Sequence, residues 1–596
     1  MAGPRGRGHG PGGNGEKPQD RKKVLKRLWT YLYRYKFLLL LAVVLSVTSN
    51  LLNLVAPKLS GEAIDAIGTK AGGVDFPRVI FCCVLMIVFY VISSALSYIL
   101  TRVMIKLSQK ITYQMRKDVF DKLVTLPIGF FDKHRTGDIV SRISYDVDTV
   151  NASLSNDLIH IVTSVFTVGG SFIMMLIISP PLIFIFAITI PMALLFTRYM
   201  VKKVRPMFHK RSRCYGDLNG FVEEMISGQR AIKSYGCEDV ICDRFDIKNT
   251  ETSEAAYDAE YYSSKVGPNV NFVNNISLAL ISVFGAIMYV YNIITPGDLS
   301  AFVLYSRRFS GPINEIANII SEIQSACAAA ERIFTLIDTP SEAKDDDDAI
   351  VLDNALGNID IEHIKFGYTK DKTIIRDFSL KADKGKLVAI VGHTGAGKTT
   401  IINLLMRFYD ADSGTIKIDG INHRKITRES LRKAFAMVLQ DTWLFEGTIF
   451  DNIAYGKKDA TLEDVKRVCK AARISSYIES LSDGYYTVLS ENGINISQGQ
   501  KQLLTIARAM LLDSSMLILD EATSNVDTTT EMHIQTAMRE LMRDKTCFVI
   551  AHRLSTIQNA DIILVMENGD IAEQGTHEEL INKNGIYQKL YCAQFR

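Results

Sequence analysis

Six long apolar segments before residue 325 constrain the fold of this 596-residue chain more than any other feature. Several of them run for about 20 residues without a charge, which is the length that an α-helix needs to cross ~30 Å of hydrocarbon. A soluble helical bundle is excluded because its helices would carry charged residues over such lengths. We predict an all-α transmembrane domain of six helices, with spans at 37–55, 80–100, 158–179, 182–200, 272–293 and 300–320.

The connections between these spans predict their orientation. Lysine and arginine are frequent before the first span and in the long connections 101–157 and 201–271. The third-to-fourth link is only Pro180-Pro181, and the fifth-to-sixth link is 295–298. Because positively charged connections stay on the cytoplasmic side, we expect both termini and both long connections in the cytoplasm. Short links and the lack of a eukaryotic targeting segment favour an integral protein of a bacterial plasma (cell) membrane.

The long connections are predicted to continue the spans as amphipathic helices that project into the cytoplasm. Residues 130–138 and 219–224 fall within them, and the first of these segments indicates a helix break followed by a new start. Basic residues clustered over 21–29 fit either an amphipathic helix on the membrane surface or an ordinary solvated helix start.

The sixth predicted span is the least apolar, because Arg307, Arg308 and Glu315 lie in it. Ionisable side chains at membrane depth are costly unless they face water or a partner. Arg308 and Glu315 are seven residues apart and share a helix face, and Gly311-Pro312 between them can kink the helix. Two interpretations stay open, a substrate cavity or gate and an ion pair within the chain.

Composition excludes two classes of function. The formal net charge of +3 is too small to indicate nucleic-acid binding, so we expect no nucleic-acid partner. The nine cysteines show no Cys-x-x-Cys spacing. This usage is typical of reduced, buried thiols rather than of a disulfide framework or a zinc site.

Changes in composition along the chain predict four segments. Residues 1–20 are rich in glycine and proline and are predicted to be a disordered tail, and 21–340 form the transmembrane domain. A charged linker, 341–357, follows, and solvation and charge repulsion explain its acidic run better than a cation site does. Residues 358–596 alternate strand-like and helix-like runs, which predicts an α/β domain.

A glycine-rich loop dominates this second domain, between a strand-like run at 387–391 and a helix-like run at 401–408. In that context glycines let backbone N–H groups turn around phosphate oxygens, and the helix N-terminus adds positive partial charge. The pattern predicts a nucleoside triphosphate site in which Lys398 reaches the β and γ phosphates and Thr399 holds Mg²⁺. The candidate binding residues are Gly392, His393, Thr394, Gly395, Ala396, Gly397, Lys398, Thr399 and Thr400.

Two further apolar runs end in side chains suited to this chemistry. Residues 516–519 lead into Asp520-Glu521, and 547–551 lead into His552. An acid at the carboxyl end of a buried strand is where an α/β nucleotide fold places a magnesium ligand, which we expect of Asp520. Glu521 is expected to orient and polarise the attacking water. His552 either contacts the γ-phosphate or orients Glu521, or it caps a helix.

A second polar turn, Ser497-Gln498-Gly499-Gln500, precedes a helix predicted over 501–512. By the same argument from backbone N–H groups, this turn is another candidate anion site. One chain therefore carries two elements that can bind phosphate.

Together these motifs resemble the ATP-binding cassette (ABC) exporters over nearly the whole chain from about residue 25. The matching segments are 392–400 (Walker A), 487–493 (X-loop), 497–500 (signature), 516–521 (Walker B) and 524–527 (D-loop, ending in Asp527). Gln440 matches the Q-loop glutamine, His552 the switch histidine, and Tyr368 the aromatic residue that stacks on adenine. The resemblance implies an α/β P-loop cassette that uses ATP and Mg²⁺, with Thr399, Gln440 and Asp520 as metal ligands.

The resemblance also implies a dimer with a second half-transporter. Two cassettes would meet head to tail, so that each ATP lies between Walker A of one chain and residues 497–500 of the other. ATP binding would close the cassettes and hydrolysis would reopen them, while segments 130–150 and 215–230 pass the motion to the spans. The expected activity is alternating-access efflux of hydrophobic or amphipathic small molecules from among the membrane lipids.

The signature departs from the family's usual Leu-Ser-Gly-Gly-Gln, because Ile496 and Gln498 replace the leucine and the first glycine. Such a change resembles heterodimeric multidrug-type exporters, in which a chain that keeps Glu521 and His552 is the hydrolysis-competent subunit. A homodimer stays open, since Gln498 need not abolish binding. A homodimeric lipid flippase shares every motif and is the alternative function. A non-transporting regulator or channel is disfavoured because it should lack Glu521.

Overall fold

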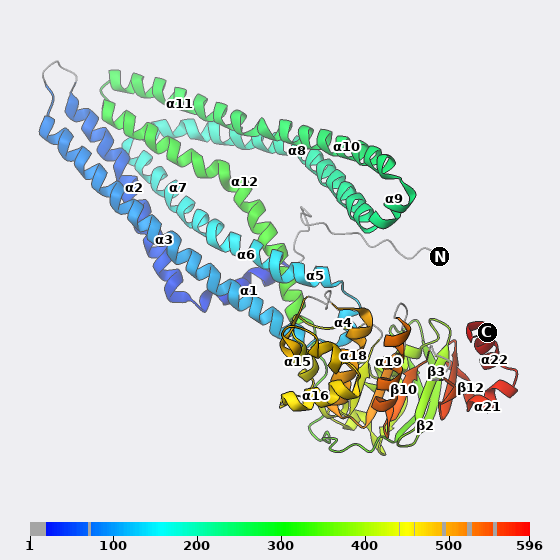
Figure 1. Cartoon of the computed structure of the whole chain (residues 1–596). Coiled ribbons are helices and arrows are strands. Elements are labelled where there is room, and N and C mark those ends of the chain that lie inside the picture. Colours follow the sequence, from blue (N-terminus) through cyan, green and yellow to red (C-terminus); the bar gives the residue numbers. More distant parts are fainter. Residues whose placement is uncertain are drawn as a thin grey trace. The chain divides into compact units, whose positions relative to one another are not determined.

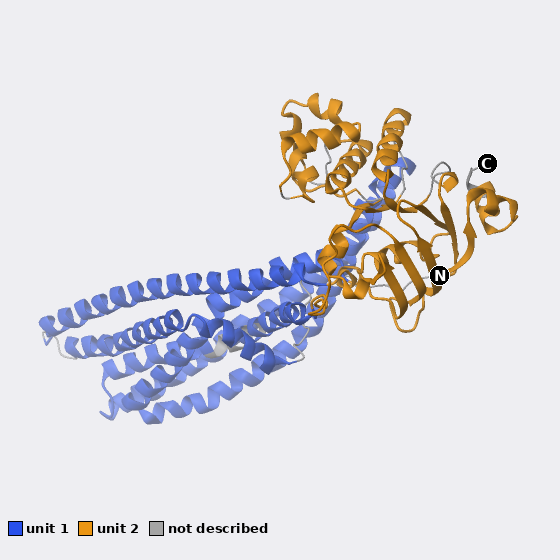
Figure 2. Ribbon diagram, turned by 90° about the horizontal axis from the view of Figure 1, so that it is seen from below, with its two compact units in different colours: residues 1–126, 134–340 blue, residues 127–133, 341–596 orange. Residues whose placement is uncertain are grey.

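The computed structural model describes residues 20–68, 73–439, 442–457, 459–490, 496–520, 527–551 and 557–595, without the side chains of 313–318, 321 and 593–595. The chain divides into two compact units, which Figure 2 colours separately. The helical unit comprises residues 1–126 and 134–340, and the sheet unit comprises 127–133 and 341–596. The short segment 127–133 therefore groups with residues that come much later in the sequence.

The helical unit contains helices much longer than a membrane span (Figure 1). Helix α3 (Phe76–Val124) has 49 residues and α8 (Pro180–Ser227) has 48. At 1.5 Å per residue each is about 70 Å long, more than twice the thickness of a bilayer core. The other helices are α1 (Arg21–Tyr33), α2 (Lys36–Ile67), α5 (Thr136–Ser141), α6 (Val147–Ala152), α7 (Leu158–Ile178), α9 (Gln229–Tyr235), α10 (Glu238–Ser264), α11 (Val266–Val290) and α12 (Pro296–Asp338), with π-turns at Arg142–Asp146 and Ser153–Asp157.

Among the described residues, five helical stretches are long and apolar enough to cross a membrane. They are Lys36–Ile67, Phe76–Val124, Thr136–Ile178, Pro180–Ser227 and Glu238–Val290, and they cover the first five predicted spans except for Ser179 and residues 291–293. The sixth predicted span lies in α12, which is not one of the five.

The two long connections are mostly helical. Helix α4 (Ile128–Phe131) and then α5 follow the end of α3, which confirms the break and restart predicted over 130–138. Residues 219–224, for which no break was predicted, lie in α8, which continues to Ser227. The chain reverses at α9, and α10 packs back along α8 to form a hairpin (Figure 1).

The sheet unit is built on a ten-stranded mixed sheet in the order β5-β4-β1-β2-β12-β11-β3-β10-β9-β6, which confirms the predicted α/β class. Strands β11, β3, β10, β9 and β6 are parallel to their neighbours in this series, and β1, β2, β4 and β5 form an antiparallel edge. The strands are β1 (Ile359–Phe366), β2 (Ile375–Ala382), β3 (Leu387–Gly392), β4 (Ser413–Ile418), β5 (Ile421–Asn422), β6 (Phe435–Val438), β9 (Met516–Asp520), β10 (Thr546–Ile550), β11 (Ile562–Glu567) and β12 (Asp570–Gly575). A separate pair joins β7 (Gly447–Thr448) to β8 (Val488–Leu489).

Helices cover the sheet and explain why its central strands are apolar without interruption. Met516 and Ile518 of β9 pack into one core cluster, whereas Leu517 and Leu519 pack into another. Alternate side chains of a strand point to opposite faces, so a strand buried on both faces needs an apolar residue at every position. The helices are α13 (Lys398–Leu405), α14 (Arg428–Lys433), α15 (Ile449–Ala454), α16 (Leu462–Ala471), α17 (Ser475–Glu479), α18 (Gln498–Leu512), α19 (Thr528–Met542), α21 (His577–Asn582) and α22 (Ile586–Phe595).

Candidate functional site

The predicted phosphate-binding loop connects β3 to α13 in the middle of the sheet. Gly392, Gly395 and Gly397 have φ angles of 154°, 86° and 105°, which L side chains rarely adopt. A Cβ atom on Gly392 would lie 2.4 Å from the carbonyl oxygen of Met566 in the neighbouring strand. Both the backbone turn and the close strand packing therefore require glycine here.

Lys398 begins α13 and folds its side chain back over this loop. Its Nζ donates to the carbonyl oxygens of Gly392 (2.6 Å) and His393 (3.2 Å). Burial lowers the pKa of the Lys398 ammonium below its usual value, and the Asp520 carboxylate opposes that shift. Among the described hydrogen bonds, this half-buried ammonium donates to neutral carbonyls over a glycine turn, and a phosphate group there would add a charged partner.

The sheet register brings Asp520 to the same edge. Ile550 of β10 lies opposite Ile390 of β3 on one side and opposite Asp520 of β9 on the other. The carboxylate therefore ends its strand next to the start of the glycine loop, where parallel α/β sheets place their ligand groups. The predicted residues Gln440, Glu521 and His552 lie outside the described residues.

Tyr368 lies beside the P-loop helix. Its hydroxyl is 3.3 Å from the hydroxyl of the buried Thr400 and accepts from the Asn403 amide (3.1 Å). The ring makes edge contacts with Phe366 and Tyr409, with centroids 5.1 and 5.0 Å apart. The structure thus gives Tyr368 a fixed place next to α13, with its side chain still 38% exposed.

The signature residues open a helix and do not form a turn in front of it. Helix α18 begins at Gln498, three residues earlier than predicted. The Ser497 hydroxyl accepts from the Gln500 amide (3.3 Å), and the Gln500 side chain accepts from the Ser497 amide (2.9 Å). This reciprocal capping box pulls the helix start forward. Gly499 is buried in the first turn, whereas Gln498 is exposed and donates to the Thr442 hydroxyl (3.3 Å).

Asp527 caps the N-terminus of α19, where its carboxylate accepts from the Thr530 amide (2.9 Å). That hydrogen bond holds the pKa of Asp527 below its usual value. Among the described contacts, neither Asp527 nor the α18 N-terminus touches the glycine loop. Within one chain, the structure therefore brings together the P-loop, Tyr368 and Asp520, and it leaves the signature residues apart from them.

The sheet unit also holds the short segment 127–133 of the earlier chain. Tyr409 follows the P-loop helix, and its hydroxyl donates to the Asp132 carboxylate. Burial and this hydrogen bond raise the pKa of the Tyr409 hydroxyl well above its usual range. A Cβ atom on Gly129 would lie 2.9 Å from the Tyr409 ring, so the segment packs closely against it.

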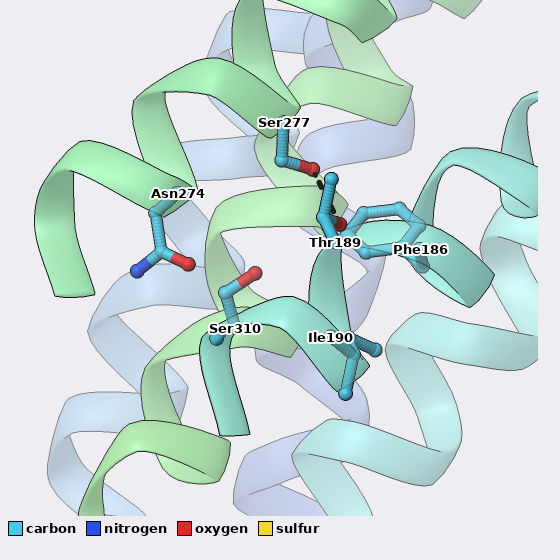
Figure 3. Close-up of a pocket in the computed structure, with 7 residues that line it drawn as sticks. Phe186, Thr189, Ile190, Asn274, Ser277 and Ser310 are labelled. Atoms are coloured by element: carbon cyan, nitrogen blue, oxygen red, sulfur yellow. Dashed lines mark hydrogen bonds between the residues drawn. The ribbon is translucent and has the colours of Figure 1, made fainter. Parts of the chain in front are cut away.

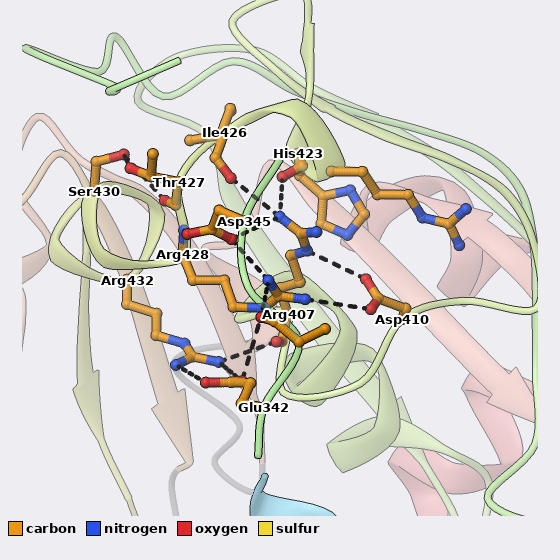
Figure 4. Close-up of polar contacts among 12 residues, drawn as sticks. Glu342, Asp345, Arg407, Asp410, His423, Ile426, Thr427, Arg428, Ser430 and Arg432 are labelled. Carbon is orange, nitrogen blue, oxygen red and sulfur yellow. Dashed lines mark hydrogen bonds and ion pairs between the residues drawn. The ribbon is translucent and has the colours of Figure 1, made fainter. Parts of the chain in front are cut away.

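A cluster of arginines fixes the start of the linker to the sheet unit (Figure 4). Arg428 Nη1 lies 2.7 Å from Asp345, and Arg432 Nη2 lies 2.5 Å from Glu342. Arg407, just beyond α13, pairs with Asp410 at 3.2 Å and reaches Asp345 at 3.7 Å. The acidic run, which was explained from the sequence by solvation and charge repulsion, is therefore held by ion pairs at Asp345.

Sequence reasoning missed this linker clasp, which comprises Glu342, Asp345, Asp410, Arg407, Arg428 and Arg432. Its partners are up to 90 residues apart, and no local pattern links them. Arg407 and Arg428 are each only 8% exposed. Charged residues are almost never buried unless paired, but burial itself could not be read from this stretch.

Comparisons with known proteins agree with this arrangement. Residues 39–313 match the model of the ABC transporter transmembrane region, and 375–524 match the ABC transporter model. An uncharacterized ABC transporter ATP-binding protein of Bacillus subtilis is 40% identical over 97% of this chain and 95% of its own length. A fatty acid ABC transporter ATP-binding/permease protein of Mycobacterium tuberculosis is 41% identical over 91% of this chain and 85% of its own.

More distant relatives share the whole architecture. An ATP-dependent lipid A-core flippase of Vibrio vulnificus is 33% identical over 96% of this chain and 98% of its own length. The structure of a bacterial Atm1-family ABC exporter with ATP bound superposes with a TM-score of 0.75 at 28% identity, covering 96% of this chain and 99% of that one. The ATP-binding domain in these matches implies an ATPase coupled to transport. With both domains matched in one chain, this protein belongs to the ABC exporters with fused transmembrane and ATP-binding domains.

Proposed function

We propose that this chain is one half of a dimeric exporter that expels hydrophobic or amphipathic compounds across a bacterial plasma membrane. The observation that carries the proposal is the Lys398 ammonium on its glycine loop, at the same sheet edge as Asp520, in a chain that also has membrane-spanning helices. The basic connections support a cytoplasmic position for the termini and the sheet unit.

At the nucleotide site, Lys398 would exchange its two loop carbonyls for phosphate oxygens, and the loop N–H groups would bind the phosphates. Thr399, which is exposed, would hold Mg²⁺ with Gln440 and Asp520, and the ion would neutralise phosphate charge. Tyr368 would stack on the adenine. Glu521 would orient and polarise the attacking water.

ABC exporters function as dimers, and the separation of the signature from the P-loop within this chain fits that rule. The α18 N-terminus presents Gln498 and Ser497 at the surface, where they would cover the ATP held by the other subunit's P-loop. Asp527, already ordered as a helix cap, would lie at the same interface.

Two segments suit the transfer of motion between ATP sites and spans. Segment 127–133 packs on Tyr409, at the end of the P-loop helix, within the sheet unit. Helix α9 is the tip of the α8–α10 hairpin, has no buried side chain and leaves Tyr235 82% exposed. We propose that α9, rather than all of 215–230, docks on the partner subunit.

The altered signature favours a heterodimer. A glutamine at position 498 adds a side chain where the family's usual glycine has none, and that side chain is already bonded to Thr442. We propose that the partner carries an unaltered signature and that this chain supplies the Glu521 needed for hydrolysis. Robust cargo-stimulated ATPase activity from this chain purified alone would contradict the heterodimer and favour a homodimer.

The second candidate function is a homodimeric lipid flippase. It is supported by the 33% identity with the lipid A-core flippase over nearly the whole of both chains. A flipping assay with fluorescent lipids in proteoliposomes separates the two functions, since only a flippase moves the lipid in an ATP-dependent way.

The ATPase assignment is tested by Glu521→Gln. We expect normal ATP binding and turnover lowered by about 10³-fold, since the variant loses the group that activates water. The matched control is Glu567→Gln, an exposed glutamate at the end of β11, which should leave turnover unchanged. Wild-type hydrolysis in Glu521→Gln would refute the role proposed for Glu521.

A further inference from the structure

A cavity lies within the helical unit between α8, α11 and α12 (Figure 3). The space that a water-sized molecule can occupy is only about 20 Å³, and it lies within a partly open depression of about 300 Å³. Thr189, Asn274, Ser277 and Ser310 supply polar groups to its lining, and Phe186 and Ile190 supply apolar surface. A hydroxyl- and amide-lined space among helices that cross a membrane is unlike the apolar packing around it.

Two of these polar side chains make hydrogen bonds within the described structure, and two do not. The Thr189 hydroxyl donates to the Ile185 carbonyl (3.1 Å) and lies 3.3 Å from the Ser277 hydroxyl. Asn274 and Ser310 have no hydrogen-bond partner among the described residues, and Figure 3 shows both side chains directed into the space between α11 and α12. They are available to bind a polar group that enters the cavity.

Arg307 lies three residues before Ser310, so the two side chains are neighbours on the surface of α12. It is eleven residues from the helix start at Pro296, or about 16 Å along the axis, which is close to half of a ~30 Å hydrocarbon core. The side chain is exposed, and no described carboxylate pairs with it.

The neighbouring Arg308 has a structural role, because its guanidinium binds a backbone carbonyl of another helix. Pro57 of α2 has no N–H group, which leaves the carbonyl of Asn53 without its helical partner. Arg308 donates to that carbonyl and approaches the Tyr90 hydroxyl (3.5 Å). Arg308 therefore satisfies the carbonyl that Pro57 leaves free, whereas Arg307 has no such contact in the described structure.

A guanidinium that faced lipid at this depth would be costly, so we expect the exposed Arg307 side chain to face a watery path. We propose that Arg307, with Asn274 and Ser310, binds the anionic head group of an amphipathic cargo, a carboxylate or phosphate on an apolar chain. The planar guanidinium offers paired N–H donors to such a group, the amide and hydroxyl complete its shell, and the tail lies along Phe186 and Ile190. This inference rests on the proposed export function and names its class of cargo.

The test uses the full-length dimer in nanodiscs of neutral lipid and measures equilibrium binding of radiolabelled probes. Oleate is compared with oleyl alcohol, and phosphatidate with diacylglycerol, so that the two pairs distinguish a free fatty acid from a lipid as the source of the charge. Arg307→Gln should weaken binding of the preferred anion about tenfold and leave its neutral analogue unchanged. Arg307→Lys should retain most of the affinity, and Arg244→Gln, an exposed change in the extension of α10, should have no effect.

Ser310→Ala gives a second variant in case Arg307→Gln does not fold, and it should weaken anion binding about threefold. Unchanged anion binding in Arg307→Gln or Ser310→Ala, or equal loss for the anion and its neutral analogue, overturns the inference. If the wild type binds oleyl alcohol but has no preference for either anion, the inference fails while the export function stands. If it binds none of the four probes, the proposed export of amphipathic compounds fails as well.

Discussion

Partly buried arginines are held differently in the two units. In the sheet unit, Arg407 and Arg428 are neutralised by carboxylates, with Asp345 2.7 Å from Arg428 and Asp410 3.2 Å from Arg407. At membrane depth in the helical unit, Arg308 has only a backbone carbonyl and a tyrosine hydroxyl among its described partners. Further along the same helix, α12, an arginine is again paired with a carboxylate: Arg332 lies 2.5 Å from the buried Asp146.

The difference follows from the cost of removing charges from water. A carboxylate at membrane depth would add its own desolvation penalty to that of the arginine. A carbonyl freed by a proline is already part of the helix and is neutral, so it satisfies the arginine without a second charge. In the sheet unit the carboxylates of Asp345 and Asp410 stay partly exposed, which lowers the cost of their ion pairs with the buried arginines, and these pairs fix the linker.

The largest expected effect comes from Arg428→Leu in the linker clasp. It removes the nearer of the two arginine partners of Asp345 and leaves Asp410 and Glu342 close together, and we expect the sheet unit to lose about 3 kcal/mol of stability. The matched control, Lys433→Leu, breaks the exposed pair with Glu429 and should cost less than ~0.5 kcal/mol. Thermal unfolding of the full chain measures both, and equal effects would show that the clasp is an ordinary surface feature.

Arg308→Leu tests the arginine of the helical unit that binds a backbone carbonyl and, among the described residues, no carboxylate. It leaves the Asn53 carbonyl unsatisfied beside Pro57, and we expect a loss of about 2 kcal/mol. Pro57→Ala restores an N–H group to that carbonyl, so Arg308→Leu should cost about 1 kcal/mol less in the Pro57→Ala background. Additive effects in this double-mutant cycle, measured by unfolding in detergent, would mean that Arg308 does not satisfy the carbonyl that Pro57 leaves free.

These arginines mark the limit of what the sequence predicts. The P-loop and the strand that ends in Asp520 were found because strong local rules, apolar runs and glycine spacing, define them. The contacts of Arg308 with Asn53 and of Arg428 with Asp345 join residues 255 and 83 positions apart, and only the folded chain brings them together. From the sequence alone, Arg308 could belong to a substrate cavity or gate, or to an ion pair. Its described contacts, with a backbone carbonyl and a tyrosine hydroxyl, show neither.

The start of α18 is a different kind of error, because a local signal was present. Ser497 and Gln500 have the spacing of a capping box, which predicts a helix beginning at Gln498. The glycine at 499 argued for a turn, but its burial in the first helical turn outweighs its low helix propensity. Glu521, His552 and Gln440 rest on the resemblance and the strand pattern, and their roles stay predictions.

Acidification adds a positive charge beside the linker clasp, because the buried His423 lies next to Arg407. His423 is 1% exposed, and neither ring nitrogen has a hydrogen-bond partner among the residues that the structure describes. Burial, aided by Arg407, lowers its pKa to about 4. Because the unfolded chain, with a histidine pKa near 6.5, binds more protons between pH 6.5 and 4, stability should fall as the pH falls through this window. We expect a loss of about 2 kcal/mol at pH 5 relative to pH 8.

Thermal unfolding of the full chain at pH 5 and pH 8, with and without His423→Phe, isolates this contribution. The variant keeps the ring volume and should remove most of the difference that comes from His423. If the wild type and the variant lose stability equally on acidification, the buried imidazole is not the sensitive group.

The smallest expected effect is that of Tyr409→Phe. This change tests a third arrangement, in which a neutral hydroxyl binds the Asp132 carboxylate of segment 127–133. The change removes one hydrogen bond to the Asp132 carboxylate and keeps the ring that packs on Gly129, so the cost should be about 1 kcal/mol. The exposed fraction of Asp132 lets water replace the hydroxyl, which keeps the loss below that of Arg428→Leu. Basal ATPase activity should persist because Lys398 and Asp520 are untouched, whereas cargo stimulation of that activity should weaken. A parallel loss of basal activity and stimulation would place Tyr409 in the nucleotide site and not in the contact with Asp132.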